Sequence, residues 1–165
     1  MDTLLGVYLN NLNINKSKVG EITGIKRQRI SDLCNKSTSK PSPEEYYKIV
    51  LATILLNNKS ENEFNKSFDL IFPNRPKANF LTEEAHLSPE TRFIRRHFLI
   101  QKTIEEKIGM SEGKISRLAS EDVKEVLAVE LICFIEGLGL DVLKTFKEIY
   151  GDVNLKGDNA DLNDI

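Results

Sequence analysis

A chain of 165 residues, with 40% hydrophobic and 29% charged side chains, has room for one large or two small globular domains. No apolar run approaches the roughly 20 residues that a membrane span needs, and the N-terminus lacks the basic start of a secretory signal, so we expect a cytoplasmic protein with no membrane partner. The formal net charge is only −2, but residues 16–40 carry +5, residues 92–117 carry +4 and residues 118–165 carry −7. The two basic segments could meet a polyanion, and the acidic C-terminal part suits a protein partner.

The spacing of cysteines and histidines predicts neither a metal site nor a catalytic centre. Cys34 and Cys133 stand alone among apolar neighbours, without a CxxC spacing or a nearby histidine. His86 and His97 lack a partner at ligand spacing, and no paired nucleophile and base is visible. We therefore expect no enzyme, no metal and no cofactor.

The N-terminal part predicts three helices in succession. Apolar residues at helical spacing indicate the first helix over residues 2–12. The next two helices, over about 16–23 and about 26–35, are separated by Gly24, which supplies a tight turn. Ile30 faces the core and leaves basic and amide side chains on the outer face of the last helix.

Two further helices complete the first unit, which we expect to span residues 1–72. Ser42, Pro43 and Glu45 form an N-terminal signature for a helix over residues 43–56, because serine caps, proline suits the first helical position and glutamate reaches back. A second capping pair and an apolar stripe predict the fifth helix. The residues that indicate it are Ser60, Glu63, Phe64, Phe68, Ile71 and Phe72.

The pattern recurs 85 residues later. Gly109, Met110, Ile115 and Leu118 occupy the positions of Gly24, Ile25, Ile30 and Leu33. We expect a second unit over residues 88–151, joined to the first by a proline-containing linker at 73–87 and followed by an acidic, disordered tail at 152–165. Its helices are predicted over about 89–98, 101–108, 111–119, 121–138 and 141–150.

These features resemble the lambda-repressor-like family of helix-turn-helix regulators, also called the Xre or Cro type, which are usually of phage or bacterial origin. The turn at Gly24 and Ile25, the inward Ile30 and Leu33, and the capped following helix carry the resemblance. It implies an all-α fold of two small five-helix domains in tandem. Gly20 departs from the family, which usually has alanine there. The second unit resembles the same superfamily less fully and is closest to phage activators of the CII type, through Gln101, Gly109, Ser111 and the run 114–118.

Helical geometry and the resemblance together indicate the residues that would touch DNA. On the helix over 26–35 the residues opposite the buried face, expected to read base edges in the major groove, are Arg27, Gln28, Ser31 and Asp32. The cations expected along the phosphate backbone are Lys16, Lys18, Lys26, Arg29 and Lys36. In the second unit the tentative DNA residues are Gln101, Lys114, Ser116 and Arg117, with Arg92, Arg95 and Arg96 as either backbone contacts or an ordinary solvated face.

In the second unit, Glu112 and Gly113 replace the expected polar reading residues, and Glu105 takes the small-residue position. DNA reading is therefore expected mainly from the first unit. The function that we expect is a sequence-specific transcriptional regulator bound to double-stranded DNA, either with its two units on adjacent half-sites or as a homodimer on a palindrome. The alternative is a protein-interaction module, an antirepressor or an adaptor, whose acidic C-terminal part contacts the partner.

Overall fold

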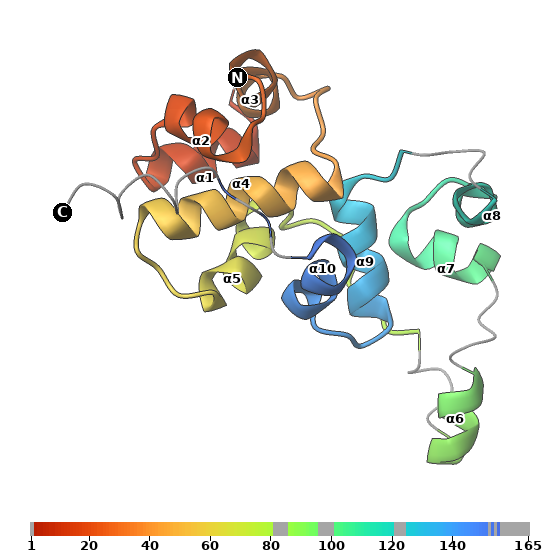
Figure 1. Ribbon diagram of the computed structural model, residues 1–165. Helices are drawn as coiled ribbons and strands as arrows, with labels where there is room; N and C mark the ends of the chain where they lie inside the picture. Colours follow the sequence, from red (N-terminus) through yellow and green to blue (C-terminus); the bar gives the residue numbers. More distant parts are fainter. Residues whose placement is uncertain are drawn as a thin grey trace. The chain divides into compact units, whose positions relative to one another are not determined.

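The computed structural model describes residues 2–80, 86–95, 101–120, 125–151, 153 and 155, without the side chains of Phe93 and Arg95. These residues form ten α-helices and no strand (Figure 1), which confirms the predicted all-helical fold. None of the described helices combines the length and the apolar character of a membrane span.

Packing divides the chain into two units. Unit 1 combines Met1–Pro73 with Phe146–Ile165, and unit 2 is Asn74–Thr145. The division differs from the predicted boundaries at both ends, because the described start of the expected linker belongs to unit 2 and the last helix contributes its C-terminal half to unit 1.

Unit 1 contains five complete helices: α1 (Leu4–Asn11), α2 (Lys16–Thr23), α3 (Arg27–Asn35), α4 (Pro43–Leu56) and α5 (Asn62–Ile71). Side-chain oxygens of Thr3, Asn15 and Ser42 cap α1, α2 and α4. The predicted capping box at the start of α4 is confirmed. The predicted cap of the fifth helix is wrong, because α5 begins at Asn62 without a side-chain cap and the Glu63 carboxylate accepts a hydrogen bond from Lys66 instead.

Helix α4 runs through the middle of unit 1, with α2 and α3 above it and α5 below it in Figure 1. Tyr46 and Tyr47 of α4 pack against Phe64 of α5 and Phe146, with ring centroids 5.6–6.2 Å apart. All four rings are buried. Each aromatic pair adds about 0.5–1.5 kcal/mol beyond its buried area, so this cluster explains why the end of α10 belongs to unit 1.

Unit 2 contains α6 (Pro89–Arg95), α7 (Gln101–Ile108), α8 (Lys114–Ala119), α9 (Ala128–Gly137) and the first part of α10 (Val142–Tyr150). Two helices are shorter than predicted. The helix expected over 111–119 begins at Lys114, and the one expected over 121–138 begins at Ala128, since residues 125–127 are not helical. Residues 96–98 and 121–124 of the predicted helices lie outside the described residues.

The expected linker is a packed part of unit 2 over residues 74–80. Arg75 is only 7% exposed, and its guanidinium forms two hydrogen bonds of 2.8 and 2.9 Å with the Glu136 carboxylate of α9. The ring of Phe80 lies where a side chain at Gly137 would stand. The backbone N–H of Phe80 donates to the Gly137 carbonyl at 2.9 Å. The prolines prevent a helix here but do not prevent burial. Except for residues 153 and 155, the expected disordered tail lies outside the described residues.

Candidate nucleic-acid interface

Helices α2 and α3 meet at a turn whose geometry requires glycine. Gly24 has φ +73°, a left-handed conformation that costs glycine little. A Cβ atom at Gly20 of α2 would lie 3.1 Å from the Ile25 carbonyl oxygen, so the turn lies close against α2 there. Ile30 and Leu33 are buried on the inner face of α3, which fixes the face that the helix turns outward.

The C-terminal end of α3 is held by the start of α1. Thr3 donates its N–H to the Cys34 carbonyl at 2.8 Å and its hydroxyl to the Leu33 carbonyl at 2.6 Å. A Cβ atom at Gly6 would stand 2.3 Å from the Cys34 oxygen, so only glycine permits this approach. The C-terminal end of α3 is therefore fixed against the start of α1.

That outer face carries the four residues predicted to read bases. Arg27 and Gln28 are exposed on the first turn, and Ser31 and Asp32 are half-buried one turn later. Within the described part of the chain, Arg27 takes part in no ion pair or side-chain hydrogen bond. Arg27 is thus available to a ligand without breaking an internal contact.

The remaining polar residues of this face bind one another. The Gln28 amide nitrogen donates to Asp32 Oδ1 at 2.9 Å, and Lys36 Nζ lies 2.8 Å from the same oxygen. The Asn35 amide donates to the Ser31 carbonyl at 2.9 Å. Hydrogen bonds from Lys36 and Gln28 lower the pKa of Asp32, so its carboxylate stays charged at neutral pH.

The predicted backbone cations of unit 1 differ in their availability. Lys18 and Lys26 are exposed, and Lys16, the first residue of α2, is half-buried. Lys18 lies 3.6 Å from Glu21, an exposed pair that contributes little to stability. Asn15 already accepts hydrogen bonds from two N–H groups at the start of α2. A phosphate at this helix end would meet lysine side chains more readily than backbone donors.

Arg29, by contrast, is committed to the fold. Its Nε and Nη2 atoms lie 2.7 and 2.8 Å from the Glu45 carboxylate, and Nη2 also donates to the Lys40 carbonyl at 3.0 Å. The same carboxylate accepts the Ser42 N–H at 2.9 Å as part of the cap of α4. Arg29 therefore joins α3 to the start of α4, and its predicted phosphate contact stays a prediction.

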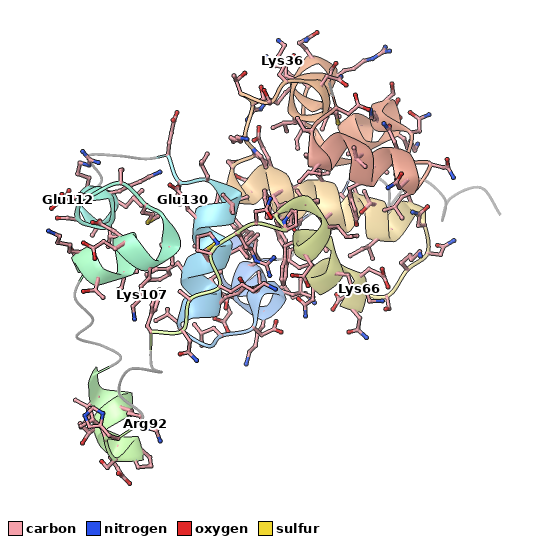
Figure 2. All side chains as sticks on the ribbon, turned by 180° about the vertical axis from the view of Figure 1, so that it is seen from behind. Lys36, Lys66, Arg92, Lys107, Glu112 and Glu130 are labelled. Atoms are coloured by element: carbon pink, nitrogen blue, oxygen red, sulfur yellow. The ribbon has the colours of Figure 1, made fainter. Side chains whose placement is uncertain are left out.

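The corresponding region of unit 2 lacks the first helical turn. Glu112 and Gly113, at the positions of Arg27 and Gln28, lie in a turn ahead of α8, and Gly113 has φ +75°. The side chain of Glu112, labelled in Figure 2, is 79% exposed and lies 3.5 Å from Lys102. Of the predicted DNA residues of unit 2, Gln101, Ser116 and Arg117 are exposed on α7 and α8.

A buried carboxylate explains this difference. Glu105, at the position of Gly20, is 2% exposed, and its two oxygens accept the N–H groups of Gly113 and Ile115 at 2.7 Å each. The Glu105 side chain, which comes from α7, thus caps the N-terminal end of α8. The cap fixes the start of α8 at Lys114, three residues later than predicted.

Lys114 is also held in an ion pair within its unit, and its predicted DNA contact stays a prediction. Its Nζ atom lies 2.7 and 2.8 Å from the two oxygens of Glu130, and both side chains are at most 16% exposed. Glu130 accepts the Leu127 N–H at 2.9 Å at the start of α9. Lys114 and Glu130 stand 85 positions after Arg29 and Glu45, so the same ion pair occurs at the same place in both units. Sequence reasoning missed the pair, although a cation 16 residues ahead of a capping glutamate occurs in both copies.

The other arginines give no further support for a DNA surface. Arg92 is half-buried on α6, while the side chain of Arg95 and the whole of Arg96 lie outside the described residues. Within the described part of the chain, no group of three or more His, Cys, Asp or Glu residues could hold a metal ion.

Comparisons of the chain with protein-family models, with curated proteins and with solved structures found no match. The functional argument depends on the geometry of these residues.

Proposed function

We propose that this protein is a sequence-specific DNA-binding transcriptional regulator of the phage or bacterial type, which reads the major groove with α3. The observation that carries the proposal is the exposure of Arg27 and Gln28 on the first turn of a helix whose opposite face is buried. An α-helix fits the major groove, and these side-chain types pair with base edges. The resemblance of both units to lambda-repressor-like domains adds support.

The two leading residues have distinct chemical roles in this proposal. Arg27 donates two hydrogen bonds to the N7 and O6 acceptors of a guanine, and Gln28 pairs with the edge of an adenine. Each such contact discriminates against a wrong base by about 1–3 kcal/mol. Lys16, Lys18 and Lys26 contact phosphates, which position the protein and make binding depend on salt.

Unit 2 has a different role in the proposal. It keeps the exposed Ser116 and Arg117 but has a turn where unit 1 has its reading residues. We assign it to protein contact, either with a second copy of the chain or with another protein. The competing function, a protein-interaction module that does not read DNA, is favoured by the charge of −7 over residues 118–165.

The test is selection of bound duplexes from a random pool with the full-length protein at moderate salt, followed by titration of the selected sequence. The double variant Arg27→Ala/Gln28→Ala should lose sequence preference while it keeps its fold. Lys66→Ala is a matched control, because this cation lies on α5, on the opposite side of unit 1 from Lys36 (Figure 2). It should select the same sequence as the wild type.

A selected motif that survives the double variant would overturn the assignment to α3. If the wild-type protein enriches no sequence and releases DNA at modest salt, the protein-interaction function replaces the proposal. A defined motif would also show, by the spacing of its half-sites, whether two units or two copies bind.

A further inference from the structure

Two polar side chains on the outer face of α3, Gln28 and Asp32, form a chain of contacts with Lys36, the residue that follows the helix. Gln28 Nε2 donates to Asp32 Oδ1 at 2.9 Å, and Lys36 Nζ lies 2.8 Å from the same atom. The side chain of Asp32 is 25% exposed and that of Lys36 59% exposed. Arg27 takes no part in this chain of contacts.

The contact with Asp32 distinguishes the two ends of the Gln28 amide. One N–H is used by the carboxylate, which leaves the second N–H and the Oε1 acceptor for an outside partner. If the amide were reversed, Oε1 would face Asp32 Oδ1, and two acceptors would repel each other. The carboxylate therefore sets which end of the amide a base meets.

We infer that Asp32 is a positioning residue for base recognition: it fixes the Gln28 amide so that the oxygen faces the base edge, and Lys36 holds Asp32 in place. This inference rests on the proposed DNA-binding function. Adenine offers an amino donor and the N7 acceptor, and cytosine offers an amino donor, whereas the atoms that guanine and thymine use for hydrogen bonding in the major groove are acceptors only. With its oxygen toward the base edge, Gln28 should therefore favour adenine or cytosine, because guanine and thymine would place an acceptor against Oε1 and could be reached only by the second N–H.

The surroundings decide how strong this selection is. On a helix in water, a hydrogen bond between Gln and Asp four residues apart favours one orientation of the amide over the other by only about twofold. At an interface that excludes water the same hydrogen bond is stronger, and a reversed amide would leave the carboxylate facing an acceptor. Lys36 offsets the negative charge of Asp32, which would otherwise repel the phosphates.

The experiment measures base preference with and without the carboxylate. Duplexes selected by the wild type are varied at each position and titrated with the wild type and three variants. Gln28→Ala identifies the base pair that Gln28 reads. Asp32→Ala should lower the preference for adenine or cytosine over guanine at that same pair by about threefold or more, a part of the roughly 5- to 150-fold that a good contact provides. Asn35→Ala, a polar residue of α3 that contacts Ser31 instead, is the matched control and should keep the full preference.

The outcomes separate this inference from the proposed function. If Asp32→Ala leaves the preference at the Gln28 pair unchanged, or changes a different pair, Asp32 is not a positioning residue while DNA reading by α3 stands. A wild-type preference for guanine or thymine at the Gln28 pair also overturns the inference. If the wild type enriches no sequence, the proposed function fails and the inference fails with it. Circular dichroism confirms that each variant is folded.

Discussion

The helix pairs α2–α3 and α7–α8 share a framework, and one difference between them, at the position of Gly20, lies where the two helices meet. Both have a glycine with φ of about +72° after the first helix, and both join the second helix to the next one through a cation and a capping glutamate. The framework is therefore repeated in three dimensions. The difference lies at Gly20, which Glu105 replaces in unit 2.

This one position changes the surface that each pair presents. With Gly20, α3 begins at Arg27 and carries two exposed polar side chains on its first turn. With Glu105, the carboxylate takes two backbone N–H groups and α8 begins at Lys114. Unit 2 therefore has a turn where unit 1 has the first turn of α3, and the buried Glu105 carboxylate holds that turn.

The largest effect is expected from removing the Glu105 side chain. Glu105→Ala leaves two part-buried N–H groups without an acceptor. Each would cost about 1–3 kcal/mol if fully buried, and partial access to water lowers that cost, so unit 2 should lose about 2–4 kcal/mol. The two buried cysteines report on the units separately, since Cys34 lies in unit 1 and Cys133 in unit 2. Burial raises the pKa of both thiols, that of Cys133 to about 11, so labelling at neutral pH requires opening.

The measurement is the rate at which a thiol reagent labels each cysteine, mapped to peptides by mass spectrometry. A loss of 2–4 kcal/mol corresponds to labelling of Cys133 roughly 30- to 900-fold faster, with Cys34 unchanged. Glu106→Ala, an exposed neighbour on α7, is the control and should label like the wild type. An equally small effect of both variants would mean that Glu105 does not hold α8.

Breaking the ion pair of either unit should cause a smaller loss of stability, and the loss should be larger in unit 2 than in unit 1. Lys114→Ala leaves the Glu130 carboxylate, only 13% exposed, without its cation and should destabilise unit 2 by about 1–3 kcal/mol. Arg29→Ala acts on Glu45, whose side chain is 22% exposed, and should cost unit 1 about 1 kcal/mol. Labelling of Cys133 and Cys34 measures the two losses. Lys102→Ala breaks only the exposed pair with Glu112 and should change neither rate. Equal losses in all three variants would contradict a structural role for the buried pairs.

Local patterns in the sequence predicted much of unit 1. The helix over 16–23 and the capping box before the helix over 43–56 are confirmed, because capping and period act between residues a few positions apart. The single-residue roles of Arg27 and Gln28 stay predictions. Their exposure was predictable, because in a helix with one buried face the spacing of the apolar residues determines which side chains face outward.

Interactions between distant residues could not be predicted in the same way. Glu105 was identified as a departure from the pattern, but a substitution gives no sign that a side chain will cap another helix eight residues away. The role of Arg29 depends on Glu45, and the place of the expected linker depends on Arg75 meeting Glu136, 61 positions later. The sequence predicted Arg29 and Lys114 as contacts to DNA, and only the tertiary structure shows that they pair with Glu45 and Glu130.

The smallest expected effect is the dependence of unit 1 on pH through Glu45. Burial raises the pKa of Glu45, but hydrogen bonds from Arg29 and Ser42 outweigh burial and leave the pKa below its ordinary value. A carboxyl group of this kind contributes stability that is complete above its unfolded pKa of about 4.3 and is lost as the pH falls through the folded pKa.

All four tyrosines lie in unit 1, so tyrosine fluorescence follows the urea unfolding of that unit alone. Between about pH 6 and about pH 3 the urea midpoint should fall more in the wild type than in Glu45→Gln. Glu44→Gln, a carboxylate of the same helix that pairs with Lys48, should fall as the wild type does. The lowered pKa values of Asp32 and Glu63 add to the fall in every variant, so the difference between variants isolates Glu45. Identical curves for wild type and Glu45→Gln would show that the Arg29–Glu45 contact of unit 1 is held by packing, with the charge of Glu45 contributing nothing.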